Sequence, residues 1–86
     1  MASYKIDFAR SALKDLRRLD RTVVSRIIQS IESLAENPRP IGARKLVGSE
    51  YTYRIRIGSY RVIYSLDDEL LIVGVQRIRH RQEAYD

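Results

Sequence analysis

The sequence predicts an α+β domain in which two helices pack on one face of an antiparallel sheet. Two stretches in the first half have apolar residues at helical spacing, and three stretches in the second half alternate apolar and polar residues as strands do. A short alternating stretch precedes the helices. The predicted order is therefore β-α-α-β-β-β: an N-terminal strand, a helical hairpin and a three-stranded C-terminal meander. The whole chain, residues 1–86, is expected to form a single domain.

The first strand is predicted over residues 4–8, where the apolar side chains of Tyr4, Ile6 and Phe8 alternate with charged ones. This period is typical of a strand with one buried face. Residues 9–19 follow with a helical stripe and predict the first helix. The small and apolar positions of that stripe are Ala9, Ala12, Leu13, Leu16 and Leu19.

The second helix is predicted over residues 21–37, with Asp20 as its N-cap. Two prolines, Pro38 and Pro40, follow directly and cannot continue a helix. Residues 41–48 are expected to form a loop with a short extended piece. The apolar stripe of the second helix comprises Val24, Ile27, Ile28, Ile31, Leu34 and Ala35.

The meander is predicted from residues 51–57, 60–66 and 70–78. The first two alternate regularly and are joined by Gly58 and Ser59, a pair that suits a two-residue turn of type II′. The third is a more continuous apolar run, as expected of a strand inside the sheet.

The predicted hairpin brings arginines together. A two-residue turn places Ile57 opposite Tyr60 and Arg56 opposite Arg61, with Arg54 one step further along the same face. Like charges opposite each other destabilise a sheet, whereas a row of arginines suits a polyanion. Alternatively, the long side chains splay apart and cover apolar surface with their stems. We favour a row of arginines that binds a polyanion, because further arginines follow near the end of the third meander strand: Arg77, Arg79 and Arg81.

The amino-acid composition favours a protein that binds an anionic partner. The net charge is +5, and thirteen of the sixteen basic residues are arginines, whose fixed fork of donors favours phosphates or an acidic protein. With no cysteine and one histidine, neither a disulfide framework nor a metal site is expected. No stretch predicts a signal peptide or a membrane span, so we expect a cytoplasmic protein without a membrane partner.

The C-terminal stretch RIRHRQEAYD adds groups that handle protons: His80 and Tyr85, with Glu83 as a further candidate. In a basic setting His80 holds or passes a proton near neutral pH, and Tyr85 acts as a base if nearby cations lower its pKa. Arginine does not share this role easily, because it stays protonated.

The element order, together with DFARSALKDLRRL, KLVGSEYTYRIRIGSYRVIY and HRQEAYD, resembles the RelE/ParE superfamily of bacterial toxins over nearly the whole chain. Resemblance to the RelE branch implies a toxin of a type II toxin–antitoxin system. It implies an endoribonuclease (mRNA interferase) that cuts mRNA in the ribosomal A site, with the substrate's 2′-hydroxyl as nucleophile and no metal or cofactor. The implied partners are a cognate antitoxin, mRNA and the 70S ribosome.

The resemblance also implies roles for residues. Arg61 and a C-terminal arginine, either Arg79 or Arg81, would stabilise charge on the scissile phosphate, and Tyr85 or His80 would take the proton of the 2′-hydroxyl. The best-known RelE proteins have lysines where this chain has Arg54 and Arg56, so a proton-donating lysine is not expected there. The expected RNA-binding residues are Arg54, Arg56, Arg77 and Lys45.

Two alternatives remain at this point. The first is a ParE-like toxin that inhibits DNA gyrase without nuclease activity. The second is a basic RNA-binding module without catalysis, which would need no proton-transfer group.

Overall fold

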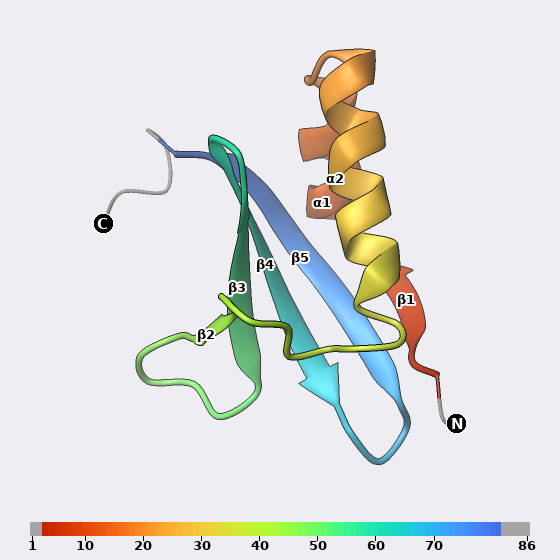
Figure 1. Cartoon of the computed structure of the whole chain (residues 1–86), viewed down its shortest axis with the longest axis vertical. Helices are drawn as coiled ribbons and strands as arrows, with labels where there is room; N and C mark the ends of the chain where they lie inside the picture. The colour runs from red at the N-terminus through yellow and green to blue at the C-terminus, as the bar shows by residue number, and fades with distance from the viewer. Residues whose placement is uncertain (1–2, 82–86) are drawn as a thin grey trace.

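The computed structural model describes residues 3–81, and within them it contains two helices and one five-stranded sheet (Figure 1). This confirms the predicted α+β class and element order, with one addition. A two-residue strand, β2, forms in the segment expected to be a loop with an extended piece. The elements are β1 (Lys5–Phe8), α1 (Arg10–Arg17), α2 (Arg21–Ser33), β2 (Arg44–Lys45), β3 (Thr52–Ile57), β4 (Tyr60–Asp67) and β5 (Ile72–His80).

The strand order in the sheet is β1-β5-β4-β3-β2. The two pairs of the meander, β3 with β4 and β4 with β5, are antiparallel as predicted, and the added β2 is antiparallel to β3. The N-terminal strand departs from the predicted antiparallel sheet, because β1 is parallel to β5. β5 has a neighbour on each side, which agrees with its continuous apolar run. The helical hairpin follows β1, and the meander then returns to place its last strand beside the first.

Both helices cover the same face of the sheet, and the core lies between them and the strands (Figure 1). α1 packs along β5 and buries Ala12, whereas α2 buries Ile27 and Ile31. The strands contribute alternate residues to the same core. The buried strand residues are Tyr53, Ile55, Val62, Tyr64, Leu66, Val73, Val75 and Ile78.

The helix ends differ from the prediction by a few residues. The N-cap is confirmed, because the Asp20 side chain accepts a hydrogen bond from the Arg21 N–H. α2 ends at Ser33, before the prolines. Beyond it the backbone tightens: Leu34 N–H donates to the carbonyl three residues back, on Ile31, at 3.0 Å.

The β3–β4 hairpin has the predicted turn and register. Ile57 pairs with Tyr60 and Arg56 with Arg61, so Gly58 and Ser59 form a two-residue loop. Gly58 has a φ of 60°, whereas Ser59 has a negative φ. A type I′ turn needs positive φ at both positions, so these values agree with type II′.

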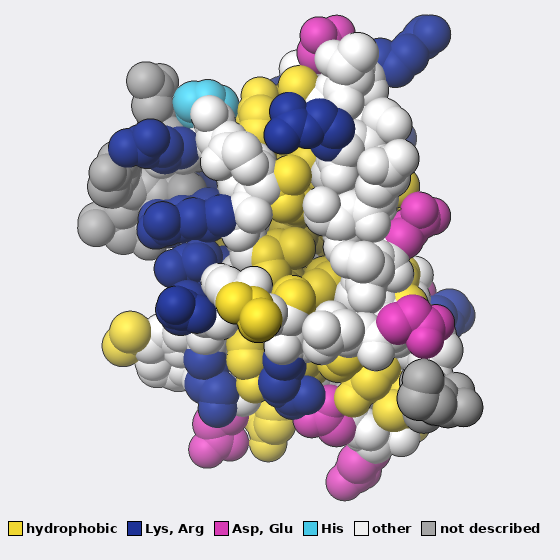
Figure 2. All heavy atoms as spheres, in the orientation of Figure 1, with side chains coloured by type: hydrophobic (Ala, Val, Ile, Leu, Met, Phe, Trp, Pro, Cys, Tyr) yellow, Lys and Arg dark blue, Asp and Glu magenta, His cyan; other side chains and the backbone are white. Residues whose placement is uncertain are grey.

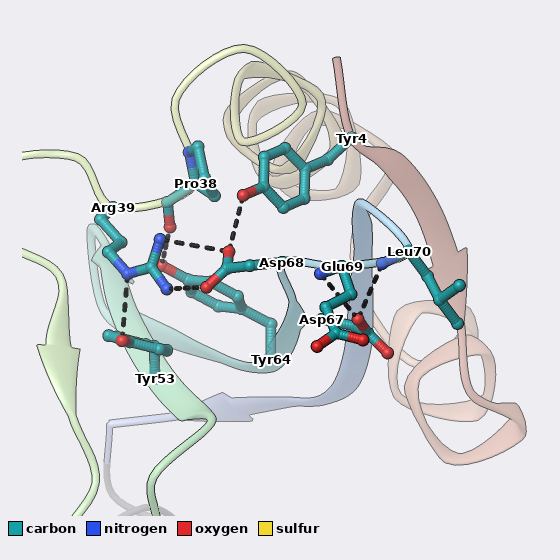
Figure 3. Close-up of polar contacts among 9 residues, drawn as sticks. All are labelled: Tyr4, Pro38, Arg39, Tyr53, Tyr64, Asp67, Asp68, Glu69 and Leu70. Atoms are coloured by element: carbon teal, nitrogen blue, oxygen red, sulfur yellow. Dashed lines mark hydrogen bonds and ion pairs between the residues drawn. The ribbon is translucent and has the colours of Figure 1, made fainter. Parts of the chain in front are cut away.

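A polar clamp joins four distant segments at the end of the sheet away from this hairpin (Figure 3). Arg39, in the segment after α2, donates to Asp68 Oδ2 at 2.7 Å and to Tyr53 Oη at 3.1 Å. The Tyr4 hydroxyl donates to Asp68 Oδ1 at 2.6 Å. The clamp therefore connects the start of the chain, the post-helix segment, β3 and the β4–β5 turn.

Tyr64 adds a buried contact beside the clamp. Its hydroxyl donates to the Pro38 carbonyl at 2.7 Å, while its ring stacks on Tyr53. Burial raises the pKa of Tyr64 to about 12, so the hydroxyl keeps its proton as a donor at neutral pH.

Asp68 should make the stability of the fold sensitive to acid. Hydrogen bonds from Arg39 and Tyr4 lower the pKa of Asp68, so its stabilising contribution is present above the unfolded-state pKa of about 4 and is lost as the pH falls through the lower folded-state pKa. We expect Asp68→Asn to lose less unfolding free energy than the parent between pH 7 and pH 3. Urea unfolding at both pH values measures this.

Asp7→Asn is the matched control. The Asp7 side chain has nearly the same exposure, 54% against 53% for Asp68, but its contact with Lys5 is long, at 3.9 Å. If Asp68→Asn and Asp7→Asn show the same acid dependence as the parent, the clamp is not the source of the acid sensitivity.

Candidate active site

Three neighbouring strands each contribute one arginine at the same level of the sheet. Arg61 on β4 pairs with Arg56 on β3 and with Arg79 on β5. Arg54 lies two residues before Arg56 and therefore shares its face. The residues that alternate with these arginines are in the core under the helices, which confirms the predicted placement of the hairpin arginines on the opposite face. We call Arg54, Arg56, Arg61 and Arg79 the arginine row.

β5 delivers Arg79 to this face because it contains a bulge. Regular alternation from the buried Val75 would turn residues 77 and 79 toward the helices. The register with β4 shifts after Val75 and leaves Gln76 as an extra residue in β5. Beyond it Ile78 is in the core, only 4% exposed, and Arg79 shares the face of the row.

The row concentrates positive charge. The pKa of Arg54 is lowered first by its partial burial and then by the charges of Arg56, Arg61 and Arg44. Each of the four arginines contributes one positive charge to this face. Since neighbouring like charges cost stability, this face is suited to a polyanion that neutralises them.

Arg81 lies next to the row, just beyond the end of β5. Its backbone N–H donates to the Ser59 carbonyl at 2.6 Å, which holds the end of β5 against the hairpin turn. A hollow of about 250 Å³ lies there. Both predicted C-terminal arginines thus lie near Arg61. The hollow is lined by Arg56, Gly58, Ser59, Tyr60, Arg61 and Arg81.

His80 is not brought to the row. It pairs with Tyr60, and their rings meet edge to face with centroids 5.1 Å apart. Because Tyr60 packs against the core, this pairing places His80 on the helix side of the sheet. Tyr85, the other predicted proton-handling residue, lies outside the described residues.

Two of the predicted RNA-binding residues make side-chain contacts outside the row. Lys45 pairs with Tyr53, and its Nζ lies 6.0 Å from the centroid of the Tyr53 ring. Arg77 forms an ion pair with Asp15 of α1, with 2.9 Å between Arg77 Nε and Asp15 Oδ2. Lys45 therefore lies on the helix side of the sheet, whereas Arg77 pairs with Ile63 on the face of the row and is held there by its ion pair with Asp15.

Arg44 is a residue of this surface that the sequence analysis missed. It pairs with Arg54 across β2 and β3, so it shares the face of the row. Arg44, Arg54 and Arg56 also line a hollow of about 450 Å³, whose other wall includes Ser30 and Ser33. Figure 2 shows Lys and Arg side chains in a column along the side of the sheet away from α2.

Among residues 3–81, no group of three or more His, Cys, Asp or Glu side chains is placed to hold a metal ion. In the same part of the chain, neither helix has the length and apolar character needed to cross a membrane.

Known proteins share this sequence pattern. The family described as ParE toxin of type II toxin-antitoxin system, parDE, matches residues 6–85. The mRNA interferase toxin RelE of Escherichia coli K12 is 37% identical over 87 aligned positions, which cover 96% of this chain and 90% of the relative. The chain therefore belongs to the RelE/ParE superfamily of type II toxin–antitoxin toxins.

Solved structures of RelE-type toxins share the fold. A chain of the RelBE2 toxin–antitoxin complex of Mycobacterium tuberculosis matches with a TM-score of 0.84 at 28% identity, covering 94% of both chains. A chain of the intact E. coli RelBE toxin–antitoxin complex matches with a TM-score of 0.79 at 34% identity, covering 91% of this chain and 96% of the other.

Proposed function

We propose that this toxin is an endoribonuclease that cuts mRNA in the ribosomal A site, and that the arginine row is its active surface. The observation that carries the proposal is the alignment of Arg56, Arg61 and Arg79 across three strands on the face opposite the helices. The relative named mRNA interferase toxin RelE supports the same activity. A fixed row of guanidiniums matches the repeating phosphates of one RNA strand.

The proposed reaction is attack by the 2′-hydroxyl on the adjacent phosphate. The 2′-oxygen loses its proton and bonds to phosphorus, while the bond from phosphorus to the 5′-oxygen breaks and that oxygen takes up a proton. Negative charge builds on the phosphate oxygens, where Arg61 and either Arg79 or Arg81 would stabilise it. The protein needs no metal for this step.

The base that accepts the 2′-hydroxyl proton is Tyr85 or His80. The Tyr60 ring and the helix-side position of His80 make the histidine the weaker candidate. We expect Tyr85→Phe, which removes only the hydroxyl oxygen, to slow cleavage by about 100-fold, and His80→Ala to slow it less. Cleavage by both variants at the parental rate would remove both residues from the mechanism.

The proposed partners are a cognate antitoxin, mRNA and the 70S ribosome, and the proposed location is the cytoplasm. The solved structures of the M. tuberculosis and E. coli relatives are complexes of toxin with antitoxin, which supports the first partner. The high positive charge of the row supports an acidic or anionic partner.

The products test this chemistry. We expect the 5′ fragment to end in a 2′,3′-cyclic phosphate, or its hydrolysis product, and the 3′ fragment to begin with a 5′-hydroxyl. The control is an mRNA with one 2′-deoxynucleotide at the cut position, which should bind the ribosome but remain intact. Fragments with a 3′-hydroxyl and a 5′-phosphate would instead indicate attack by water and contradict the proposal.

The ParE name of the matching family favours one second candidate, a toxin that inhibits gyrase without cutting RNA. A supercoiling assay with purified gyrase distinguishes it. Inhibition of supercoiling together with intact mRNA would support this candidate over the nuclease.

A further inference from the structure

We propose that Asp15 on α1 is a positioning residue for the cleavage reaction, because it holds the β5 bulge that turns Arg79 toward the arginine row. The inference rests on the proposed function. The Asp15 carboxylate accepts three hydrogen bonds from the residues just after the bulge. Its Oδ2 accepts from the Ile78 N–H at 2.9 Å and from Arg77 Nε at 2.9 Å, and its Oδ1 accepts from Arg77 Nη2 at 3.3 Å.

The bulge lies where β5 loses its neighbour strand. β1 pairs with β5 only as far as Phe8 with Val75. Beyond that point, side chains of α1 contact the outer edge of β5. Ser11 Oγ donates to the Gln76 carbonyl at 2.7 Å, and Asp15 accepts from the Ile78 N–H. Two side chains one helical turn apart thus bind the backbone on either side of Arg77.

The bulge decides which face receives Arg79. If β5 were regular from Val73 to Arg79, its odd-numbered residues would all lie on the core side of the sheet, Arg79 included. The extra residue, Gln76, changes this parity, so that Ile78 enters the core and Arg79 pairs with Arg61. A strand that relaxed to regular pairing would need to slip by one residue and would exchange the two faces.

The charge of Asp15 suits this task. The carboxylate is only 12% exposed, and although that burial opposes ionisation, the hydrogen bonds from Arg77 and Ile78 lower the pKa of Asp15 overall. A charged acceptor binds these three N–H donors more strongly than a neutral one. It also holds the Arg77 guanidinium at the edge of the sheet, beside the row but not in it.

The first test is the cleavage rate of Asp15→Ala. We expect kcat on ribosome-bound mRNA to fall by about 100-fold, the scale expected when a catalytic group moves by 1 Å, with little change in KM. The control is Asp68→Ala, which also removes a carboxylate bound to an arginine, 2.7 Å from Arg39, but at the clamp. Both variants are compared at a temperature at which circular dichroism shows them fully folded.

The second test is a rescue. Deleting Gln76 removes the extra residue, so that β5 becomes regular while Arg79 keeps its pairing with Arg61. We expect this deletion in the Asp15→Ala background to restore cleavage at least 10-fold. A merely stabilising role of Asp15 does not predict recovery, because the deletion replaces none of the lost hydrogen bonds.

The third test does not depend on activity. Amide hydrogen exchange measured by NMR should be faster for Ile78 in Asp15→Ala than in the parent, and unchanged for Ile78 in Asp68→Ala. If Asp15→Ala exchanges and cleaves like Asp68→Ala, or the deletion fails to restore cleavage in a folded protein, the positioning role is wrong. If the parent itself does not cut mRNA, the proposed function fails, and exchange at Ile78 still shows whether Asp15 holds the bulge.

Discussion

Replacing Arg61 by alanine should slow cleavage of ribosome-bound mRNA by about 100- to 1,000-fold, which corresponds to about 3–4 kcal/mol of lost transition-state stabilisation. Arg61 is the central member of the row, between Arg56 and Arg79, so a phosphate bound there is near all three guanidiniums. Single-turnover cleavage of mRNA in programmed ribosomes measures the effect.

The same substitution should leave the fold intact. It relieves repulsion between directly opposed arginines, worth about 0.2–1 kcal/mol, so the free energy of unfolding should not fall by the amount that a lost core contact causes. Arg17→Ala is the matched control, because Arg17 is an exposed arginine on α1 and its removal lowers the net charge equally. Equal losses of cleavage in both variants would show that total charge, not the row, is responsible.

The largest effect on stability is expected for Ile31→Ala, which should lower the free energy of unfolding by about 2–5 kcal/mol. Ile31 is fully buried on α2 and packs in the single core cluster between helices and sheet. A domain of this length has a total stability of about 4–13 kcal/mol, so the variant should lose a large fraction of it and unfold at a lower urea concentration than the parent.

Urea unfolding of Ile31→Ala and Ile31→Val measures this loss. The valine variant removes one methylene and should cost about 0.5–1.5 kcal/mol. A loss below 1 kcal/mol for the alanine variant would mean that α2 does not pack on the sheet as described.

The faces of the β3–β4 hairpin could be predicted because two local signals agree. The period-2 pattern assigns each side chain a face, and the Gly58–Ser59 turn determines which residues oppose each other. Together they predicted the pairs Arg56 with Arg61 and Ile57 with Tyr60, which the structure confirms. Such pairs depend only on residues close in sequence.

The placement of His80, Arg77 and Lys45 depends on contacts between distant segments. The β5 bulge changes which face of the sheet the residues after it occupy. Asp15, which accepts hydrogen bonds beside the bulge, is 62 residues away from Arg77 in the sequence. One trace of the bulge is visible in the sequence, since the apolar positions run Val73, Val75 and then Ile78.

The placement of the β2 residues, at the other edge of the sheet, also could not be predicted from local sequence. A strand of two residues carries no readable period, so the choice between Arg44 and Lys45 as the residue on the row's face depends on its register with β3. Lys45 was expected to bind RNA and Arg44 was not considered, whereas the structure pairs Lys45 with Tyr53 and places Arg44 opposite Arg54.

The central claim is that the arginine row cuts mRNA during translation, and mapping mRNA ends in cells tests it most directly. The parent and Arg61→Ala are each induced, with and without an inhibitor that blocks translation initiation, and the new ends are sequenced. We predict cuts inside translated reading frames for the parent only, and their disappearance when initiation is blocked. Intact mRNA after induction of a toxic parent, or equal cutting by Arg61→Ala, would contradict the claim.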